Sequence, residues 1–275
     1  MSRPLERRVE GDVAGLTWPV LEDGGVSAVV TERGGGVSTG PYASLNLGLH
    51  VGDDPAAVVE NRRRAAALVG AGLDDLVFCN QTHGREVVVV TNADRGRGAR
   101  TADDAIPGAD ALVTTDPAVA LVVMVADCVP IVLADLDARV LACVHAGWRG
   151  TVARVVEATV DVMVGEGARR DRILALLGPA VPPERYQVGP DVADAAAACF
   201  GANLDRVLLP DDTEAADDRW RFDLWTGNEL LLRAAGIPTE HVSRAAAVPT
   251  GGDRFFSDRA VRPCGRFAAI ARLHH

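Results

Sequence analysis

The sequence predicts an α+β fold in which mixed sheets and helices belong to one domain. Short apolar segments come in runs between the predicted helices, which favours an α+β arrangement over a series of βαβ units. No internal repeat and no linker rich in proline, serine or glycine divides the chain. We therefore expect the polar residues 1–13 to form a flexible N-terminus and residues 14–275 to form a single domain.

Composition and charge exclude several classes of protein. The 275 residues carry a formal net charge of −10, so no basic surplus is available to neutralise the phosphates of a nucleic acid. Five cysteines at irregular spacings do not resemble a disulfide framework, which favours the reducing cytoplasm. We expect neither a signal peptide nor a membrane span, because the longest apolar run, 118–126, is too short to cross a bilayer.

Glycine and helix-capping residues indicate where the first predicted strand ends and where the first predicted helix begins. Residues 25–31 predict a strand that enters a glycine-rich turn at 32–38, where no lysine follows to complete a phosphate-binding P-loop. An aspartate pair and a proline at 53–55 predict the start of a helix that runs to about residue 69. Within this helix the charged segment 61–64 predicts a solvated face, with an inward orientation of Asn61 and Arg62 as the alternative.

Two short strands surround the first candidate functional residue. Residues 76–79 and 86–91 are apolar enough to form strands, and the polar loop between them contains His83. Residues 92–110 are rich in Asp, Arg, Gly and Ala and predict an exposed loop.

The central part of the chain predicts buried strands and a hairpin. Continuous apolar runs predict buried strands at 111–115 and 118–125, and residues 130–135 and 139–145 are expected to pair as a hairpin. Alternation along 139–145 divides its side chains between two faces: Leu141, Cys143 and His145 on one, and Val140, Ala142 and Val144 on the other. Thr151 is expected to cap a helix to about residue 164. The remaining expected elements are a strand at 173–177, helices at 191–200 and 226–235, and a last strand at 267–271.

Three residues at strand ends have the chemistry of metal ligands. His83, Cys128 and His145 supply two imidazoles and one thiolate, the number of protein ligands that a catalytic zinc takes. Cys143 is a rival ligand because it shares a face with His145, although a buried cysteine is usually a small core residue. On the residues alone, a zinc site and a metal-free nucleophile pair of Cys and His remain equally open.

The segment after His145 has the features of an anion site. Residues 147–151, Gly-Trp-Arg-Gly-Thr, lead into the predicted helix, whose free N–H groups would favour an anion together with the guanidinium of Arg149. Trp148 offers a flat face for stacking. The alternative is that Trp148 closes the end of the sheet while Arg149 forms a structural ion pair. Arg259 and Arg266, near aromatic residues of the tail, could also belong to the anion site. Structural ion pairs explain these two arginines equally well.

Three blocks of the sequence together resemble the signature of a known family. They are Asn-Gln-Thr-His-Gly at 80–84, Ala-Asp-Cys-Val-Pro-Ile at 126–131 and Val-His-Ala-Gly-Trp-Arg-Gly-Thr at 144–151. The likeness extends over nearly the whole chain, in segments 33–50, 61–62, 178–179, 186–189, 223–225 and 255–257. On these residues the chain resembles the YfiH-like family of laccase-domain proteins, which includes polyphenol oxidases and peptidoglycan editing factors.

The resemblance implies a zinc-dependent purine nucleoside phosphorylase. Its implied substrates are phosphate with adenosine, inosine, guanosine or S-methyl-5′-thioadenosine, and adenosine deaminase activity is implied as well. The zinc ligands would be His83, Cys128 and His145, and copper is less expected. The implied fold is an α/β/β/α sandwich like the catalytic domain of cytotoxic necrotizing factor.

The tail departs from the family pattern, which leaves its role on the substrate side open. The usual Cys-Thr before Phe-Phe-Ser is here Pro249-Thr250, and Ala260 replaces an arginine.

Residues beside the expected ligands receive provisional roles. Asp127 is our candidate for proton transfer, with a hydrogen bond to a ligand histidine as the alternative. In phosphorolysis, phosphate would be held by Arg33, Arg149 and the helix start at Thr151. Trp148 would stack the base. The candidate substrate contacts are Arg33, Asn46, Trp148 and Thr151, and the candidate catalytic residues are Asp127, Cys128 and Arg149.

Three rival functions follow from the same residues. In a metal-free hydrolase that edits peptidoglycan precursors, Cys128 would be the nucleophile and His145 its base. In a binding module the zinc would be structural and would need a fourth protein ligand, which these blocks do not offer. A copper-type polyphenol oxidase is the least favoured, because one His–Cys–His set cannot supply several copper sites.

Overall fold

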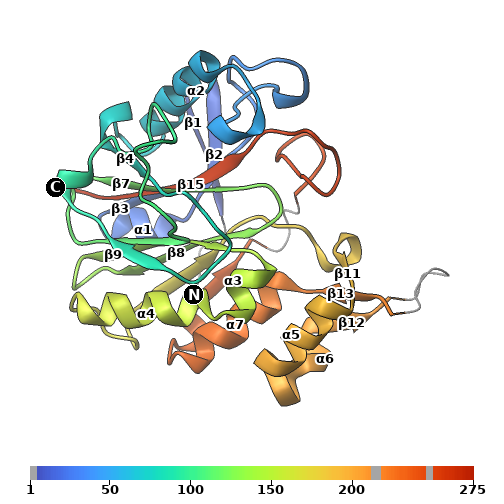
Figure 1. Cartoon of the computed structure of the whole chain (residues 1–275). Helices are drawn as coiled ribbons and strands as arrows, with labels where there is room; N and C mark the ends of the chain where they lie inside the picture. The colour runs from blue at the N-terminus through green and yellow to red at the C-terminus, as the bar shows by residue number, and fades with distance from the viewer. Residues whose placement is uncertain (1–4, 212–217, 246–249) are drawn as a thin grey trace.

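The computed structural model describes residues 5–211, 218–245 and 250–275. Two six-stranded sheets lie face to face between helices, with α2 on one side and α4 and α7 on the other (Figure 1). This order of layers is the expected α/β/β/α arrangement, and both sheets are mixed, as predicted. The likeness to the catalytic domain of cytotoxic necrotizing factor stays a prediction.

The first sheet has the strand order β1-β2-β3-β15-β7-β4. Only the edge pair β4–β7 is parallel, and the other pairs are antiparallel. The strands are β1 (Glu6–Glu10), β2 (Val13–Thr17), β3 (Val26–Thr31), β15 (Phe267–Leu273), β7 (Ala120–Val125) and β4 (Leu76–Phe78).

The second sheet has the order β14-β10-β8-β9-β6-β5, with parallel pairs at both edges. Its strands are β14 (Val242–Arg244), β10 (Leu174–Leu177), β8 (Val129–Asp135), β9 (Val140–Ala146), β6 (Ala111–Thr114) and β5 (Val87–Val89). The predicted hairpin is β8–β9, in register from the pair Val129–Ala146 to the pair Asp135–Val140. A small antiparallel sheet, β11-β13-β12, is formed by β11 (Gln187–Val188), β13 (Trp220–Phe222) and β12 (Leu208–Pro210).

Helices α2 and α7 begin at residues whose side chains cap them. Helix α2 (Pro55–Ala67) begins after Asp54, whose carboxylate accepts a hydrogen bond from the Ala56 amide at 3.0 Å, and Pro55 occupies its first turn. Asp223 caps α7 (Leu224–Ala234) in the same way. The other helices are α1 (Pro19–Asp23), α3 (Trp148–Val152), α4 (Val155–Gly165), α5 (Pro190–Phe200) and α6 (Leu204–Val207). In the described part of the chain, no helix has both the length and the apolar character that a membrane crossing needs.

Three apolar clusters fill the spaces between the layers. One joins α2 to the outer face of the first sheet, and a second lies between the sheets. A third joins the second sheet to α4, α5 and α7. The predicted alternation along β9 is confirmed, because Leu141 and Cys143 face the first sheet while Val140, Ala142 and Val144 face the helices.

Two local predictions were wrong, and for a third segment the alternative interpretation is the correct one. Residues 6–10 are not frayed but form β1, which pairs with β2. The helix expected from Thr151 is two helices, α3 and α4, because Arg154 adopts a left-handed conformation (φ 65°) between them. Segment 61–64 does not form a uniformly solvated face, since Asn61 and Arg62 are buried and bind backbone carbonyls of the loops over α2.

Candidate metal centre

A cavity of about 600 Å³ opens beside the ends of β7, β8 and β9. It is lined by segments from much of the chain, including loop 79–83, residues 124–128 and the C-terminal segment 258–266. A volume of this size suits a small organic ligand such as a nucleoside. The candidate ligands His83, Cys128 and His145 all line this cavity.

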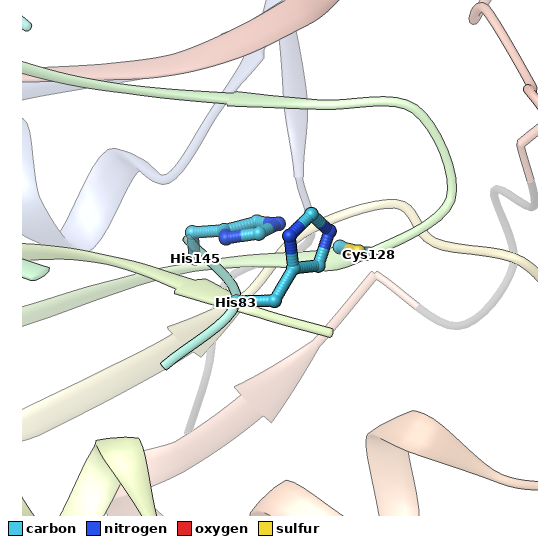
Figure 2. A group of neighbouring side chains, drawn as sticks. All are labelled: His83, Cys128 and His145. Atoms are coloured by element: carbon cyan, nitrogen blue, oxygen red, sulfur yellow. The ribbon is translucent and has the colours of Figure 1, made fainter. Parts of the chain in front are cut away.

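The three predicted ligands converge. Their ligand atoms all lie within 4.8 Å of one another, and the side chains point toward a common centre (Figure 2). His83 comes from the loop after β4, Cys128 immediately precedes β8, and His145 lies in β9. Two imidazoles and one thiol at this spacing could hold a metal ion.

Asp110, which sequence analysis placed in an exposed loop, is fully buried and organises the centre. Its carboxylate lies 2.8 Å from Nδ1 of His145, which leaves Nε2 of that ring toward the other ligands. The same carboxylate accepts hydrogen bonds from the backbone amides of His83 at 2.9 Å and Gly84 at 2.6 Å. These bonds hold the left-handed conformation of His83 (φ 61°), so one carboxylate orients two candidate ligands.

Cys128 and His145 perturb each other's protonation. Burial raises the pKa of the Cys128 thiol, but the charge on His145 and hydrogen bonds from both histidines lower it to about 6. Burial lowers the pKa of His145, but the Cys128 thiolate and the Asp110 carboxylate raise it to about 9. The thiol therefore readily becomes a thiolate, the form that binds metals and attacks electrophiles.

Gly147 is required by the close packing of this centre. A Cβ atom at position 147 would lie 2.7 Å from Sγ of Cys128 and 3.2 Å from Cδ2 of His83. The first distance is shorter than a carbon atom tolerates and the second is tight, so a side chain at position 147 would force Cys128 to move.

Asp127 has a different role from the expected one. Its Oδ1 accepts hydrogen bonds from the hydroxyls of Thr250 at 2.7 Å and Ser257 at 2.6 Å, and its Oδ2 accepts one from the Arg259 amide at 2.7 Å. The carboxylate therefore ties the C-terminal segment to the residue beside Cys128 and contacts neither ligand histidine. In the tail segment that departs from the family pattern, Pro249 lies outside the described residues. Thr250 is one of the residues that hydrogen-bond to Asp127.

The predicted aromatic and cationic contacts do line the cavity. Trp148 is half-buried, and the guanidinium of Arg149 lies 4.3 Å from its ring centroid. A second such pair, missed in the sequence, is formed by Arg259 and Tyr186 at 5.0 Å. Both arginines are at the cavity, where they favour substrates with negative charge.

Three other candidate substrate contacts do not line the cavity and are corrected. Thr151 is fully buried, and its hydroxyl accepts a hydrogen bond from Asn228 at 2.9 Å. Asn46 is also fully buried, and its side chain accepts a hydrogen bond from the Arg266 amide at 2.8 Å. Arg33 donates to the Ala43 carbonyl at 2.8 Å. The hydrogen bonds of these residues connect parts of the scaffold. Thr151 also does not begin a helix, because it lies inside the five-residue helix α3.

Cys143 is not part of the centre. Its side chain is fully buried between the sheets and lies 3.8 Å from the Leu121 carbonyl. Burial raises the pKa of its thiol well above the ordinary range. It is a core residue, which was the alternative reading of its position in β9.

The fold and the site together define a mixed α/β protein with a candidate metal centre in a ligand-sized cavity. The family model described as multi-copper polyphenol oxidoreductase laccase matches residues 27–274. The chain belongs to this family, which confirms the resemblance seen in the sequence.

Named relatives and a solved structure are similar over most of the chain. A protein of Deinococcus radiodurans named purine nucleoside phosphorylase is 40% identical over 243 residues, or 88% of this chain and 87% of its own. A protein named adenosine deaminase RL5, from an unknown prokaryotic organism, is 38% identical over 218 residues, 79% of this chain and 82% of its own. The crystal structure of the Bacillus licheniformis protein YfiH superposes with a TM-score of 0.90 at 32% identity and covers 97% of this chain and 98% of that one.

Proposed function

We propose that this protein is a zinc-dependent purine nucleoside phosphorylase that also deaminates adenosine. The observation that carries the proposal is the His83–Cys128–His145 group at the wall of a nucleoside-sized cavity. The names of the Deinococcus radiodurans relative and of RL5 support both reactions. We keep adenosine, inosine, guanosine and S-methyl-5′-thioadenosine as the proposed nucleosides.

The donor set favours zinc over copper. Two imidazoles and one thiolate fit the three protein ligands of a catalytic zinc, and a metal at this place supplies Lewis acidity to the cavity. Within the described ranges the His83–Cys128–His145 group is the one cluster found that could hold an ion. A multicopper oxidase needs several copper sites, so the family's descriptive name is a weaker guide to the reaction than the donor set.

The chain's own residues bind and orient the reactants. Asp110 holds His83 and His145 in place, and Trp148 and Tyr186 supply flat surfaces for the base. In phosphorolysis a phosphate oxygen bonds to C1′ of the ribose while the C1′–N9 bond breaks. The purine leaves with the bonding electron pair and takes up the proton of hydrogen phosphate. Arg149, at the cavity wall, is placed to stabilise the negative charge that develops.

The test combines metal analysis with product analysis. Purified protein is assayed with adenosine, inosine and methylthioadenosine, with and without phosphate, beside the Cys128→Ala variant. We expect phosphate-dependent release of the base, phosphate-independent deamination of adenosine, and loss of zinc and both activities in the variant. A variant that keeps its zinc and full phosphorolysis would contradict the assignment.

A second candidate is a metal-free Cys–His hydrolase acting on amide bonds of peptidoglycan precursors. The observation in its favour is the lowered pKa of Cys128 beside the raised pKa of His145, which resembles an activated thiolate pair. Near-stoichiometric zinc in the purified protein would disfavour this hydrolase, because a thiolate bound to zinc is not free to act as the nucleophile.

Two general expectations remain part of the proposal. All five cysteines are free, which supports a reducing compartment such as the cytoplasm. We also propose that residues 14–275 belong to a single domain, to which β1 and the start of β2 add the edge of the first sheet. The proposed partners are purine nucleosides and phosphate, with no nucleic acid or membrane.

A further inference from the structure

Arg62 is a buried cation without an acidic partner. Only 2% of the residue is exposed, and no carboxylate among the described residues forms an ion pair with it. Its Nε donates to the Leu47 carbonyl at 2.8 Å, and its Nη1 donates to the carbonyls of Gly98 and Ala99. The guanidinium also lies over the ring of Phe78, with Cζ 3.8 Å from the ring centroid. Burial lowers the pKa of the guanidinium to about 9, and no acidic neighbour raises it. The carbonyls and the aromatic ring offset part of the cost of burying this charge, but none of them carries the negative charge that would neutralise it.

One end of the guanidinium of Arg62 has only a weak partner. Its Nη2 lies 3.6 Å from Sδ of Met124, and a thioether sulfur accepts hydrogen bonds poorly. Arg62 and Met124 both line the cavity. The backbone of Met124 is bonded at both its amide and its carbonyl to the side chain of Gln81, two residues before His83. The wall beside Arg62 is thus continuous with the loop of the candidate metal centre.

His50 and Arg266 are among the other basic residues that line the cavity. Burial lowers the pKa of His50, and the charges of Arg266 and Arg62 lower it further; all three residues line the same cavity. Arg266 donates to the carbonyl of Cys264 at 3.1 Å, and its Nη2 lies 3.4 Å from Asp258. That carboxylate also pairs with Arg262 at 2.6 Å, so one negative group faces two arginines. The cavity wall therefore keeps an excess of positive charge.

We propose that Arg62, Arg266 and His50 form the subsite that binds inorganic phosphate. The inference rests on the proposed phosphorolysis and replaces Arg33 and Thr151, which the structure places away from the cavity. Arginine is suited to this task because its planar guanidinium donates two parallel hydrogen bonds to an oxyanion. Arg62 supplies a rigid, desolvated charge from α2. Arg266 and His50 contact the anion from two other segments that line the cavity.

The test separates phosphate binding from the rest of catalysis. Arg266→Met and His50→Gln change the subsite without altering Arg62, which also supports the fold. The matched control is Arg233→Met, which removes one exposed positive charge from α7, outside the cavity. For each variant, KM for phosphate is measured in inosine phosphorolysis, and adenosine deamination is measured in parallel because it consumes water and not phosphate. Binding of inorganic phosphate is measured directly by calorimetry.

We expect Arg266→Met to weaken phosphate binding and raise KM for phosphate on the order of tenfold or more, since hydrogen bonds to charged groups are strong. Arg266→Lys should recover part of the loss. Deamination and the control variant should stay near wild type. Unchanged phosphate affinity in folded Arg266→Met and His50→Gln would overturn the subsite and leave the proposed function intact.

Two outcomes separate the possible failures. If the zinc-loaded wild type neither phosphorolyses nor deaminates nucleosides, the proposed function fails, and calorimetry with phosphate still tests the subsite. If Arg266→Met weakens binding of a nucleoside 5′-monophosphate but not of inorganic phosphate, the anion bound here is a substrate phosphoryl group and the proposal is overturned.

Discussion

Nδ1 of His145 lies 2.8 Å from Oδ1 of Asp110, and the backbone amide of His145 also donates to the Asp110 carbonyl at 2.8 Å. Both residues are buried. Because the same carboxylate binds the amides of His83 and Gly84, it sets the position of two candidate ligands that are 62 residues apart in the sequence.

Asp110→Asn should weaken metal binding without preventing folding. The amide cannot accept all the hydrogen bonds that the carboxylate accepts, and it cannot stabilise a positively charged or metal-bound imidazole equally well. Loss of such a partner typically lowers metal affinity about 10–100-fold. Zinc affinity is measured by competition with a chromophoric chelator. Asp116→Asn is the control, since Asp116 also accepts bonds from backbone amides but is remote from the cavity. Equal zinc affinity in the two variants would contradict the role of Asp110.

Gly147→Ala should displace the ligands it contacts. The added methyl group would lie 2.7 Å from Sγ of Cys128, so the thiol or the loop must move. We expect loss of most bound zinc in elemental analysis, with a fold that remains native by circular dichroism. Gly165→Ala, at the end of α4 where a Cβ meets nothing within 4 Å, is the matched control. A zinc-replete Gly147→Ala protein would show that the packing is looser than described.

Asp127→Asn distinguishes a structural tie from proton transfer. Because Asp127 holds Thr250, Ser257 and Arg259, we expect lower thermal stability and a higher KM for the nucleoside, with zinc retained. Thr250→Val removes one of the same hydrogen bonds and should reproduce part of the effect. If Asp127 instead transfers a proton, kcat should fall by about 10²–10⁴-fold and one limb of the pH–rate profile should disappear.

Stability should depend on the protonation of Glu32. This buried carboxylate bonds to Arg7 and Arg254. Burial raises its pKa, but these hydrogen bonds bring the pKa below its ordinary value of 4.5. Its contribution is therefore present above about pH 4.5 and is lost as the pH falls through the folded pKa. Both arginines are about half exposed, so Glu32→Gln should cost about 1 kcal/mol at neutral pH and flatten this pH dependence in urea unfolding. Glu166→Gln, which removes an exposed carboxylate, is the control; a steep acid loss retained in Glu32→Gln would contradict the assignment.

The sequence predicts the candidate metal ligands better than it predicts the residue that holds them in position. His83, Cys128 and His145 stand at strand ends, where apolar patterns and the family blocks mark them. Asp110 follows a polar, charged stretch and gives no such signal, because its partners lie in two other segments. Its position directly before the buried run at 111–115 was the one available hint.

Family motifs also do not distinguish substrate contacts from scaffold. Arg33, Asn46 and Thr151 belong to family blocks, yet each binds backbone or side-chain groups away from the cavity. For Arg62 a solvated helical face was the first expectation and an inward orientation the alternative, because a charged run gives no indication that a neighbouring loop supplies carbonyl partners. The strands and the mixed sheets were predictable because apolar periodicity follows directly from burial, whereas the α/β/β/α layers were implied by the family resemblance.

The most direct test of the account is the metal content of the purified protein, determined beside phosphate-dependent release of hypoxanthine from inosine. The account predicts about one zinc per chain, bound through three protein ligands, and loss of both zinc and activity in Cys128→Ala. A protein that is free of metal and still releases hypoxanthine at the full rate would contradict it.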